Sequence, residues 1–208
     1  GGCSAVVSDN TAIQFKMLNR SKGPAMWSPR VQSDRAAFSQ CWRELLENTQ
    51  NLDFYQEMVS GLIVKKGRVS GVKTALGAEI KATTVVLTNG TFLNGLIHVG
   101  DKNFGGGRAG ERPAKGLTEN LTALGFSSGR MKTGTPPRVD GRSLDYTKMT
   151  LQPGDKDPQK FSFLDTTSPV ENQLPCHMTY TNIEVHNLLR EGFDKSPMFN
   201  GRIKSIGP

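Results

Sequence analysis

The sequence predicts a mixed α/β fold, and three observations lead to that prediction. The first is an apolar stripe with helical spacing, formed by Phe38, Cys41, Trp42, Leu45 and Leu46, which places these side chains on one face of a helix. The second is a β-rich stretch over residues 52–91. The third is the short β-branched run Val85–Leu87, which ends at Gly90 and predicts a buried strand.

The N-terminal elements follow from local signals. Residues 13–20 alternate loosely between apolar and polar side chains and predict a strand. Ser33 has the side chain of a helix N-cap, and Asp34 would complement the dipole in the first turn. We therefore expect a helix from about residue 34 to residues 48–51.

The β-rich stretch divides into four strands. We expect one strand at residues 53–59, a hairpin of residues 61–65 and 69–76 around the turn Lys66–Arg68, and a return strand over residues 79–87. A helix, a strand, a β-meander and a last strand ending on glycine are typical of flavin-binding Rossmann-type domains, in which the meander replaces a helical crossover. We therefore interpret residues 1–97 as a partial FAD-binding domain.

The composition changes beyond Leu96. Residues 102–142 hold eight basic and three acidic side chains, a net charge of +5. Leu117, Leu121 and Leu124 predict one helix, and a Thr181–Glu184 capping box predicts another. Residues 151–171 read as a surface excursion. The change in composition indicates a second, basic domain of mixed α/β type at residues 98–208.

Charge and cysteine usage limit the functional classes. The 208 residues carry a net charge of +7 with a pI near 9.5, which indicates an anionic partner. Three scattered cysteines, none in a C-x-x-C pair, predict neither a disulfide framework nor a metal site and fit a reducing cytoplasm. No apolar run approaches the ~18 residues of a transmembrane helix, so we expect no membrane association.

A glycine-rich loop at residues 105–110 is the first candidate binding element. It matches G-x-G-x-x-G, but it follows a charged segment and precedes Pro113, whereas the dinucleotide fingerprint joins a strand directly to a helix. Its backbone N–H groups could form a concave anion site beside the guanidinium group of Arg108. The alternative is a flexible surface turn.

A basic cluster near the N-terminus is the second candidate. Its members surround Trp27 and are Lys16, Arg20, Lys22, Arg30 and Arg35. Cations interleaved with an aromatic ring suit a phosphate chain with a stacked base. The alternative is that Trp27 fills the core and the cations are only solvated.

Several stretches together resemble the GidA/MnmG family. They are SKGP at residues 21–24, TNGTFL at 88–93, GGRAG at 106–110, KTGTPPR at 132–138 and PCHMTYTN at 175–182. Each is weak alone, but the ordered combination is specific and extends from about residue 9 to the end. This family consists of flavoproteins that modify the wobble uridine of certain tRNAs. The resemblance implies that residues 98–208 are an inserted domain that faces substrate and cofactor.

The resemblance implies a reaction and partners. Such an enzyme holds FAD, is reduced by NADH, and joins a one-carbon unit from methylenetetrahydrofolate, with glycine or ammonium, to C5 of the uridine. The product is a carboxymethylaminomethyl or aminomethyl uridine. The implied partners are tRNA, a GTPase and a second copy of the full-length protein.

Roles for individual residues are also implied by the resemblance. The positions expected to contact FAD are Val59, Gly90, Gly105, Gly106, Gly107 and Arg108. Those expected to face flavin and folate are Lys132, Thr133, Gly134, Thr135 and Arg138. Contacts to tRNA or cofactor phosphates are expected from Arg20, Lys22, Arg30 and Arg35.

Two features of the family are missing from this sequence. The family's N-terminal G-x-G-x-x-G unit and its reactive cysteines have no match here, and Cys176 is not one of those cysteines. No catalytic residue is therefore assigned, and we expect an internal fragment that alone neither turns over nor holds FAD well. Two alternatives stay open: a free-standing basic RNA-binding module without redox chemistry, and a folate- and FAD-dependent tRNA uridine methyltransferase.

Overall fold

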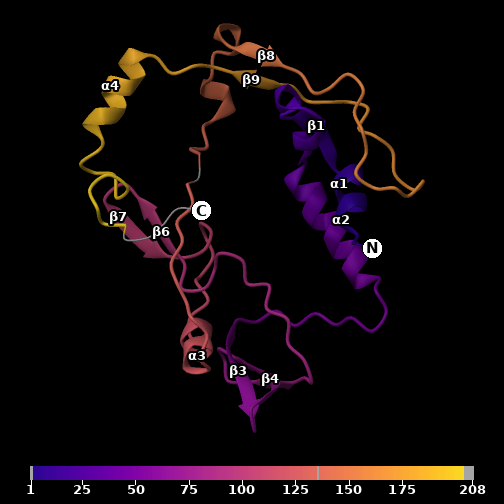
Figure 1. Cartoon of the computed structure of the whole chain (residues 1–208), viewed down its shortest axis with the longest axis vertical. Coiled ribbons are helices and arrows are strands. Elements are labelled where there is room, and N and C mark those ends of the chain that lie inside the picture. Colours follow the sequence, from indigo (N-terminus) through magenta and orange to yellow (C-terminus); the bar gives the residue numbers. More distant parts are fainter. Residues whose placement is uncertain (1, 135, 204–208) are drawn as a thin grey trace. The chain divides into compact units, whose positions relative to one another are not determined.

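The computed structural model describes residues 2–134 and 136–203. It has the expected mixed α/β composition, with helices and small antiparallel sheets (Figure 1). The chain forms two compact units: residues 1–54 with 139–180, and residues 55–138 with 181–208. The division into domains at residues 1–97 and 98–208 stays a prediction.

The first unit is built around an N-terminal hairpin and two helices. Its helices and strands are α1 (Ser4–Asn10), β1 (Ala12–Leu18), β2 (Ser28–Ser33), α2 (Arg35–Glu47), β8 (Thr150–Gln152) and β9 (Cys176–Met178). β1 pairs antiparallel with β2, and β8 pairs antiparallel with β9. Val7 and Phe15 are fully buried and form the core of this unit.

Helix α2 lies where the sequence predicts it, with one correction at its start. The side chain of Asp34, not Ser33, caps the helix by accepting a hydrogen bond from the Ala37 N–H at 2.8 Å. The predicted apolar face is less exposed than the rest of the helix, and Phe38 and Trp42 on it meet edge to face. α1 packs against α2.

Residues 151–171, which the sequence predicts as a surface excursion, are anchored to the first unit at Asp9, although Phe163 between the anchor points is fully exposed. The carboxylate of Asp9 accepts hydrogen bonds from the Phe161 N–H, the Ser162 N–H and the Thr167 hydroxyl at 2.7, 2.9 and 2.9 Å. Ser162 and Thr167 are buried, each 6 % exposed. This anchor could not be predicted from local patterns because the partners are more than 150 residues apart.

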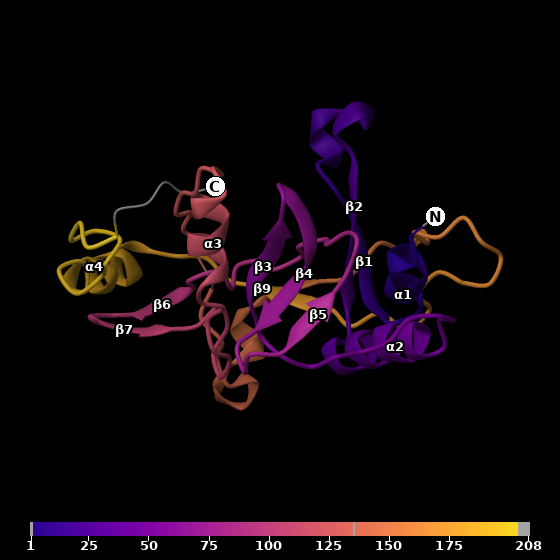
Figure 2. The same ribbon diagram turned by 90° about the horizontal axis from the view of Figure 1, so that it is seen from below.

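The second unit holds the β-meander expected from the sequence. Its helices and strands are β3 (Val59–Lys65), β4 (Arg68–Thr74), β5 (Glu79–Lys81), β6 (Leu96–Val99), β7 (Lys102–Gly105), α3 (Leu117–Ala123) and α4 (Ile183–Glu191). β3, β4 and β5 lie side by side in antiparallel order (Figure 2). The strand predicted over residues 53–59 is wrong, because regular pairing begins only at Val59.

The buried strand predicted at Val85–Leu87 is also not found. The segment has no strand assignment in the described structure, and Val86 is 84 % exposed. An extended apolar run becomes a strand only when a neighbouring strand supplies ladder hydrogen bonds. No strand within residues 2–134 and 136–203 pairs with this run.

Helix α4 starts one residue later than the predicted capping box implies. Asn182, not Thr181, is the N-cap, and its side chain accepts a hydrogen bond from the Val185 N–H at 2.9 Å. An amide oxygen at this position satisfies a backbone donor that the helix leaves unpaired.

Candidate functional site

The second unit contains an open apolar hollow beside the start of β3. Its volume is about 470 Å³. The residues that line it are Glu57, Met58, Val59, Val72, Val85, Val86, Leu87, Thr88, Asn89, Phe92, Leu93, Ala114 and Leu117. The run after β5, which the sequence predicts as a strand, therefore forms one wall of this hollow.

A hydrogen bond between β3 and α3 positions two walls of the hollow. The side chain of Asn120 on α3 accepts this bond from the Leu62 N–H at 2.9 Å. The same side chain also packs over Gly61, whose Cβ position lies 3.6 Å from Cγ of Asn120. Leu117, at the start of α3, is consequently held in the lining with Val59.

The lining is chemically simple. One carboxylate belongs to it, that of Glu57, and it already accepts a hydrogen bond from the Leu76 N–H at 2.7 Å. Most other lining side chains are aliphatic, together with the ring of Phe92. Such a surface suits a flat, weakly polar ring, whose orientation would be set by a few backbone groups.

The glycine-rich loop lies next to Phe92 and is shaped by close packing. A Cβ on Gly107 would lie 2.5 Å from Cδ1 of Phe92, and a Cβ on Gly106 would lie 2.8 Å from the carbonyl oxygen of Glu111. Gly106 donates its N–H to the carbonyl of Gly95 at 2.9 Å. Two of the glycines are therefore required by the fold of the loop itself, whatever the loop binds.

Arg108 does not point into the hollow. Its guanidinium group forms an ion pair with the carboxylate of Glu111, and it is not a lining residue. Gly105 ends β7, with its Cβ position 3.2 Å from the ring of Pro113. The structure thus brings Val59 to the hollow and leaves Gly105 and Arg108 outside its lining.

The remaining positions predicted to contact or face the cofactor differ in their distance from the hollow's lining and in their exposure. Gly90 has a left-handed φ of 55° and directly follows Asn89, which lines the hollow. Lys132 is half-buried, whereas Thr133, Gly134 and Arg138 are exposed. Thr135 lies outside the described residues, and none of the hollow's lining residues comes from this loop.

A polar bridge connects the segment after Gly90 to α3. Asn94, with a left-handed φ of 47°, donates from its side chain to Glu119 at 2.7 Å, and Arg130 donates to the Asn94 carbonyl at 3.1 Å. Glu119 also accepts from the Gly116 N–H at 3.1 Å. Hydrogen bonds from its own backbone N–H, and then from Asn94, lower the pKa of Glu119.

The four predicted phosphate contacts belong to the first unit. Arg20, Lys22, Arg30 and Arg35 are all exposed. Arg20 forms an ion pair with Asp155 at 2.8 Å, and its guanidinium group lies over the ring of Trp27 at 5.8 Å. Trp27 is 45 % exposed, so the alternative that it fills the core is wrong.

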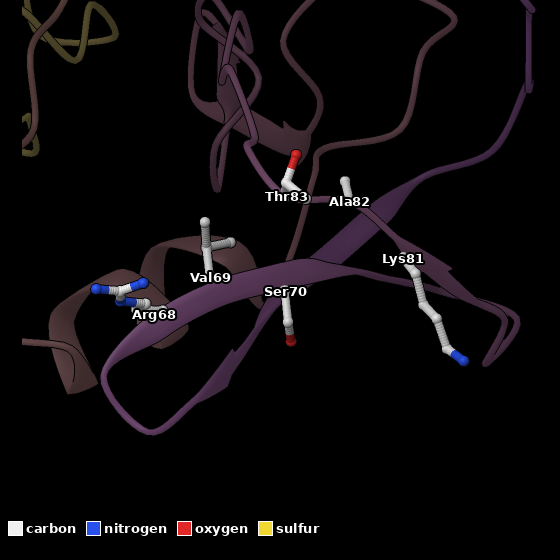
Figure 3. A pocket seen from close by; sticks show the side chains of 6 residues that line it. All are labelled: Arg68, Val69, Ser70, Lys81, Ala82 and Thr83. Atoms are coloured by element: carbon white, nitrogen blue, oxygen red, sulfur yellow. The ribbon is translucent and has the colours of Figure 1, made fainter.

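A second depression lies on the meander, between β4 and the residues after β5. Figure 3 shows Val69, Ala82 and Thr83 on one side of the ribbon, whereas Ser70 and Lys81 point to the other side. The side chains of Arg68 and Lys81 point away from one another. Because its cations do not converge, we assign no anion site to this depression.

Residues 2–134 and 136–203 contain no group of three or more His, Cys, Asp or Glu side chains arranged to hold a metal ion. None of the helices described there combines the length and apolar character needed to cross a membrane.

Sequence reasoning missed several walls of the hollow. Phe92 and Leu93 follow the predicted strand, and Leu117 was assigned only to a helix face. Gly95 is a usable signal, since a glycine next to a strand often marks a place where another backbone approaches closely. Which segments approach one another could not be derived from that signal.

Known proteins match this chain over its whole length. The family whose model matches residues 1–208 is described as glucose inhibited division protein A. Relatives from Flavobacterium psychrophilum and Christiangramia forsetii are 69 % and 70 % identical over all 208 residues. Both are named tRNA uridine 5-carboxymethylaminomethyl modification enzyme MnmG, and this chain spans 33 % of the length of each.

Solved structures give the same result. GidA from Aquifex aeolicus in its form I crystal has a TM-score of 0.89 and 41 % identity, covering 100 % of this chain and 36 % of that one. The form II crystal gives 0.85 and 42 %, covering 92 % and 33 %. The resemblance seen in the sequence is therefore confirmed: the chain belongs to the GidA, or glucose inhibited division protein A, family.

Proposed function

We propose that this chain is part of an FAD-dependent enzyme that modifies the wobble uridine of tRNA. The observation that carries the proposal is the identity of about 70 % over all 208 residues to relatives named as tRNA uridine modification enzymes. The chain spans about a third of those relatives. The proposed activity accordingly belongs to a protein of their full length.

The apolar hollow is the part of this chain that fits a flavin nucleotide. Its aliphatic lining and the ring of Phe92 suit the adenine ring, and Val59 lies where a strand backbone could pair with adenine's polar edge. Gly90, beside the lining residue Asn89, could let the cofactor approach the backbone closely. When bound, FAD would supply the redox chemistry, and these residues would hold and orient its nucleotide.

The glycine-rich loop fits this proposal less well than the hollow does. Arg108 is already paired with Glu111, so it would have to exchange that partner to contact a cofactor phosphate. Gly105, Gly106 and Gly107 can contribute backbone N–H groups only where their packing leaves those groups accessible. We propose these four positions as FAD contacts that contribute less to binding than Val59 and Gly90.

The finer features of the reaction are proposed from the family. NADH would reduce the flavin, methylenetetrahydrofolate would supply the one-carbon unit, and glycine or ammonium would supply the nitrogen. Lys132, Thr133, Gly134, Thr135 and Arg138 would face flavin and folate. A GTPase partner, a full-length homodimer and a cytoplasmic location complete the proposal, and the isolated 208-residue chain would have no turnover and hold little FAD.

A chimera tests the proposal. In the full-length Flavobacterium psychrophilum relative, the segment aligned with this chain is replaced by residues 1–208, and the chimera is expressed in bacteria that lack their own enzyme. We expect the purified chimera to carry flavin, seen by its visible absorbance. We also expect mass spectrometry of digested tRNA to detect carboxymethylaminomethyl or aminomethyl uridine.

A pair of variants ties the flavin to the hollow. Val59→Arg places a charge in the apolar lining and should lower the flavin affinity by about tenfold or more, because an unpaired buried cation is costly. Leu76→Arg makes the same change at a side chain that is 88 % exposed, and should keep the flavin. A folded chimera without flavin and without modified uridine would contradict the proposed function, and equal flavin loss in both variants would contradict the assignment of the hollow.

A further inference from the structure

The loop that joins β1 to β2 is a structured projection. Figure 2 shows its two turns of 3-10 helix, Arg20–Lys22 and Pro24–Met26, extending beyond the ends of both strands. We call residues 19–30 the hairpin tip. This tip carries Trp27 and three of the five cations of the N-terminal basic cluster.

The hairpin tip is held by local contacts. Left-handed φ angles at Asn19 (59°) and Gly23 (89°) turn the chain. Three hydrogen bonds between backbone groups close the turns: Lys22 N–H to the Asn19 carbonyl at 3.0 Å, Met26 N–H to the Gly23 carbonyl at 3.0 Å, and Trp27 N–H to the Pro24 carbonyl at 3.2 Å. A rigid loop loses less conformational entropy when it binds a ligand.

Trp27 is fixed in an exposed position. Its indole N–H donates to the Arg20 carbonyl at 3.3 Å, and the Arg20 guanidinium group lies 5.8 Å from the ring centre. Arg20 is fixed in turn by its 2.8 Å ion pair with Asp155. The indole is nevertheless 45 % exposed, and its neighbour Met26 is 52 % exposed. The fold thus holds a large aromatic surface at the protein–water boundary.

The hairpin tip and the adjoining strands carry excess positive charge. Lys16 and Arg30 are directly opposite one another on β1 and β2, so two cations share one face of the ladder. The Lys16 ammonium group donates to the Pro153 carbonyl at 3.1 Å. The carboxylate of Asp155 pairs with Arg20 and also accepts from the Met17 N–H. Arg30 is exposed, so its guanidinium group can contact an external anion.

We propose that the hairpin tip is an RNA-docking element, in which Trp27 stacks on an unpaired base and Lys22 and Arg30 contact the adjoining phosphates. Exposed aromatic rings beside cations bind single-stranded nucleic acid in this way, because every base has a face that can stack. The inference rests on the proposed function, since it names the part of this chain that meets the tRNA. An inorganic anion would satisfy the cations but would not use the indole.

Tryptophan fluorescence can observe the contact directly. The sequence has two tryptophans, and Trp42 lies on the half-buried face of α2. Trp42→Phe therefore leaves Trp27 as the only reporter in the 208-residue chain. We expect an unstructured single-stranded RNA to quench this fluorescence, and inorganic phosphate to leave it unchanged.

Matched substitutions separate stacking from charge. Trp27→Leu should weaken RNA binding about tenfold, measured by fluorescence anisotropy of labelled RNA, whereas Trp27→Phe should keep most of the affinity because it retains an aromatic face. Arg30→Gln should reduce the slope of log affinity against log salt by about 0.7, the value for one phosphate contact on a single strand. Arg68→Gln removes an exposed cation from the β3–β4 turn and should leave the slope unchanged.

The outcomes are distinct from those for the proposed function. RNA binding without quenching of Trp27, or equal loss in Trp27→Phe and Trp27→Leu variants with native circular dichroism, would overturn the docking proposal even if the chimera modifies tRNA. Equal salt slopes for Arg30→Gln and Arg68→Gln would do the same for the phosphate contacts. A chimera that fails to modify tRNA while Trp27 is quenched by RNA would overturn only the proposed enzyme activity.

Discussion

The two compact units differ in how their extended segments are paired. The first unit closes around Val7 and Phe15, and side chains join segments that are far apart in sequence. Gln14 donates to the Leu174 carbonyl at 2.9 Å, and Gln173 accepts from the Phe15 N–H at 2.8 Å. In the second unit the apolar walls of the hollow stay open, and Val86 is 84 % exposed.

This difference indicates where each unit obtains its stability. The first unit satisfies the outer edge of β1 with its own chain, through the segment that contains Gln173 and Leu174. The second unit leaves extended apolar chain unpaired at Val85–Leu87. An open apolar wall gains free energy when it is covered, which is consistent with the proposed flavin nucleotide in the hollow.

The largest effect is expected from Asp9→Ala, which tests whether the first unit depends on its long-range anchor. The substitution leaves three donors without their carboxylate, and we expect the free energy of unfolding to fall by about 3 kcal/mol. Both tryptophans belong to this unit, so urea denaturation followed by tryptophan fluorescence reports on it. The control is Asp157→Ala, which changes an exposed residue. An equal loss of stability at both positions would show that the Asp9 hydrogen bonds do not stabilise the first unit.

A smaller effect, in the second unit, is expected from Gly107→Ala. The added methyl group would lie 2.5 Å from Phe92, so we expect a local cost of about 2 kcal/mol from overpacking. The amide proton of Gly106, which is bonded to the Gly95 carbonyl, should then exchange with solvent about 30-fold faster.

Two controls accompany that measurement. Gly134→Ala meets no atom within 4 Å of the new methyl group and should leave the exchange rate unchanged. Adding Phe92→Ala to Gly107→Ala should recover part of the loss, because it removes the atoms that clash. Unchanged exchange in Gly107→Ala would show that the glycine-rich loop is loosely packed and that its fold does not require a glycine at this position.

The smallest effect is expected from Asp155→Asn and depends on pH. Burial would raise the pKa of Asp155, but the Met17 N–H and the Arg20 guanidinium group outweigh it and hold the pKa below its ordinary value of 3.8. A lowered pKa in the folded state stabilises the protein above the unfolded pKa, and this contribution is lost as the pH falls through the folded pKa. We expect the variant to be less stable by about 1 kcal/mol at neutral pH, with the difference shrinking below about pH 4.

Urea denaturation at a series of pH values, with the same tryptophan signal, measures this difference. Asp157→Asn provides the matched control, because its side chain is exposed. A deficit that stays constant down to acidic pH would mean that Asp155 acts through packing and not through its charge.

Local elements were predictable because their signals are local. The helical stripe on α2, the β3–β4 hairpin and the helix predicted from Leu117, Leu121 and Leu124 are all found. The caps at Ser33 and Thr181 are each wrong by one residue, because the next residue also has a capping side chain and can begin the helix one position later. The family was identified from the order of short motifs, and the whole-chain match confirms it.

The sequence by itself determined the mixed α/β class, the meander, the basic character and the family, because each depends on nearby residues or on their order along the chain. Only the tertiary structure decided that Asp9 anchors a segment 150 residues away, that Val85–Leu87 forms the wall of a hollow, and that Trp27 is exposed. The physical reason is that burial and pairing depend on which distant segments meet. Apolar residues in a short run favour contact with one another, but they do not specify the partner.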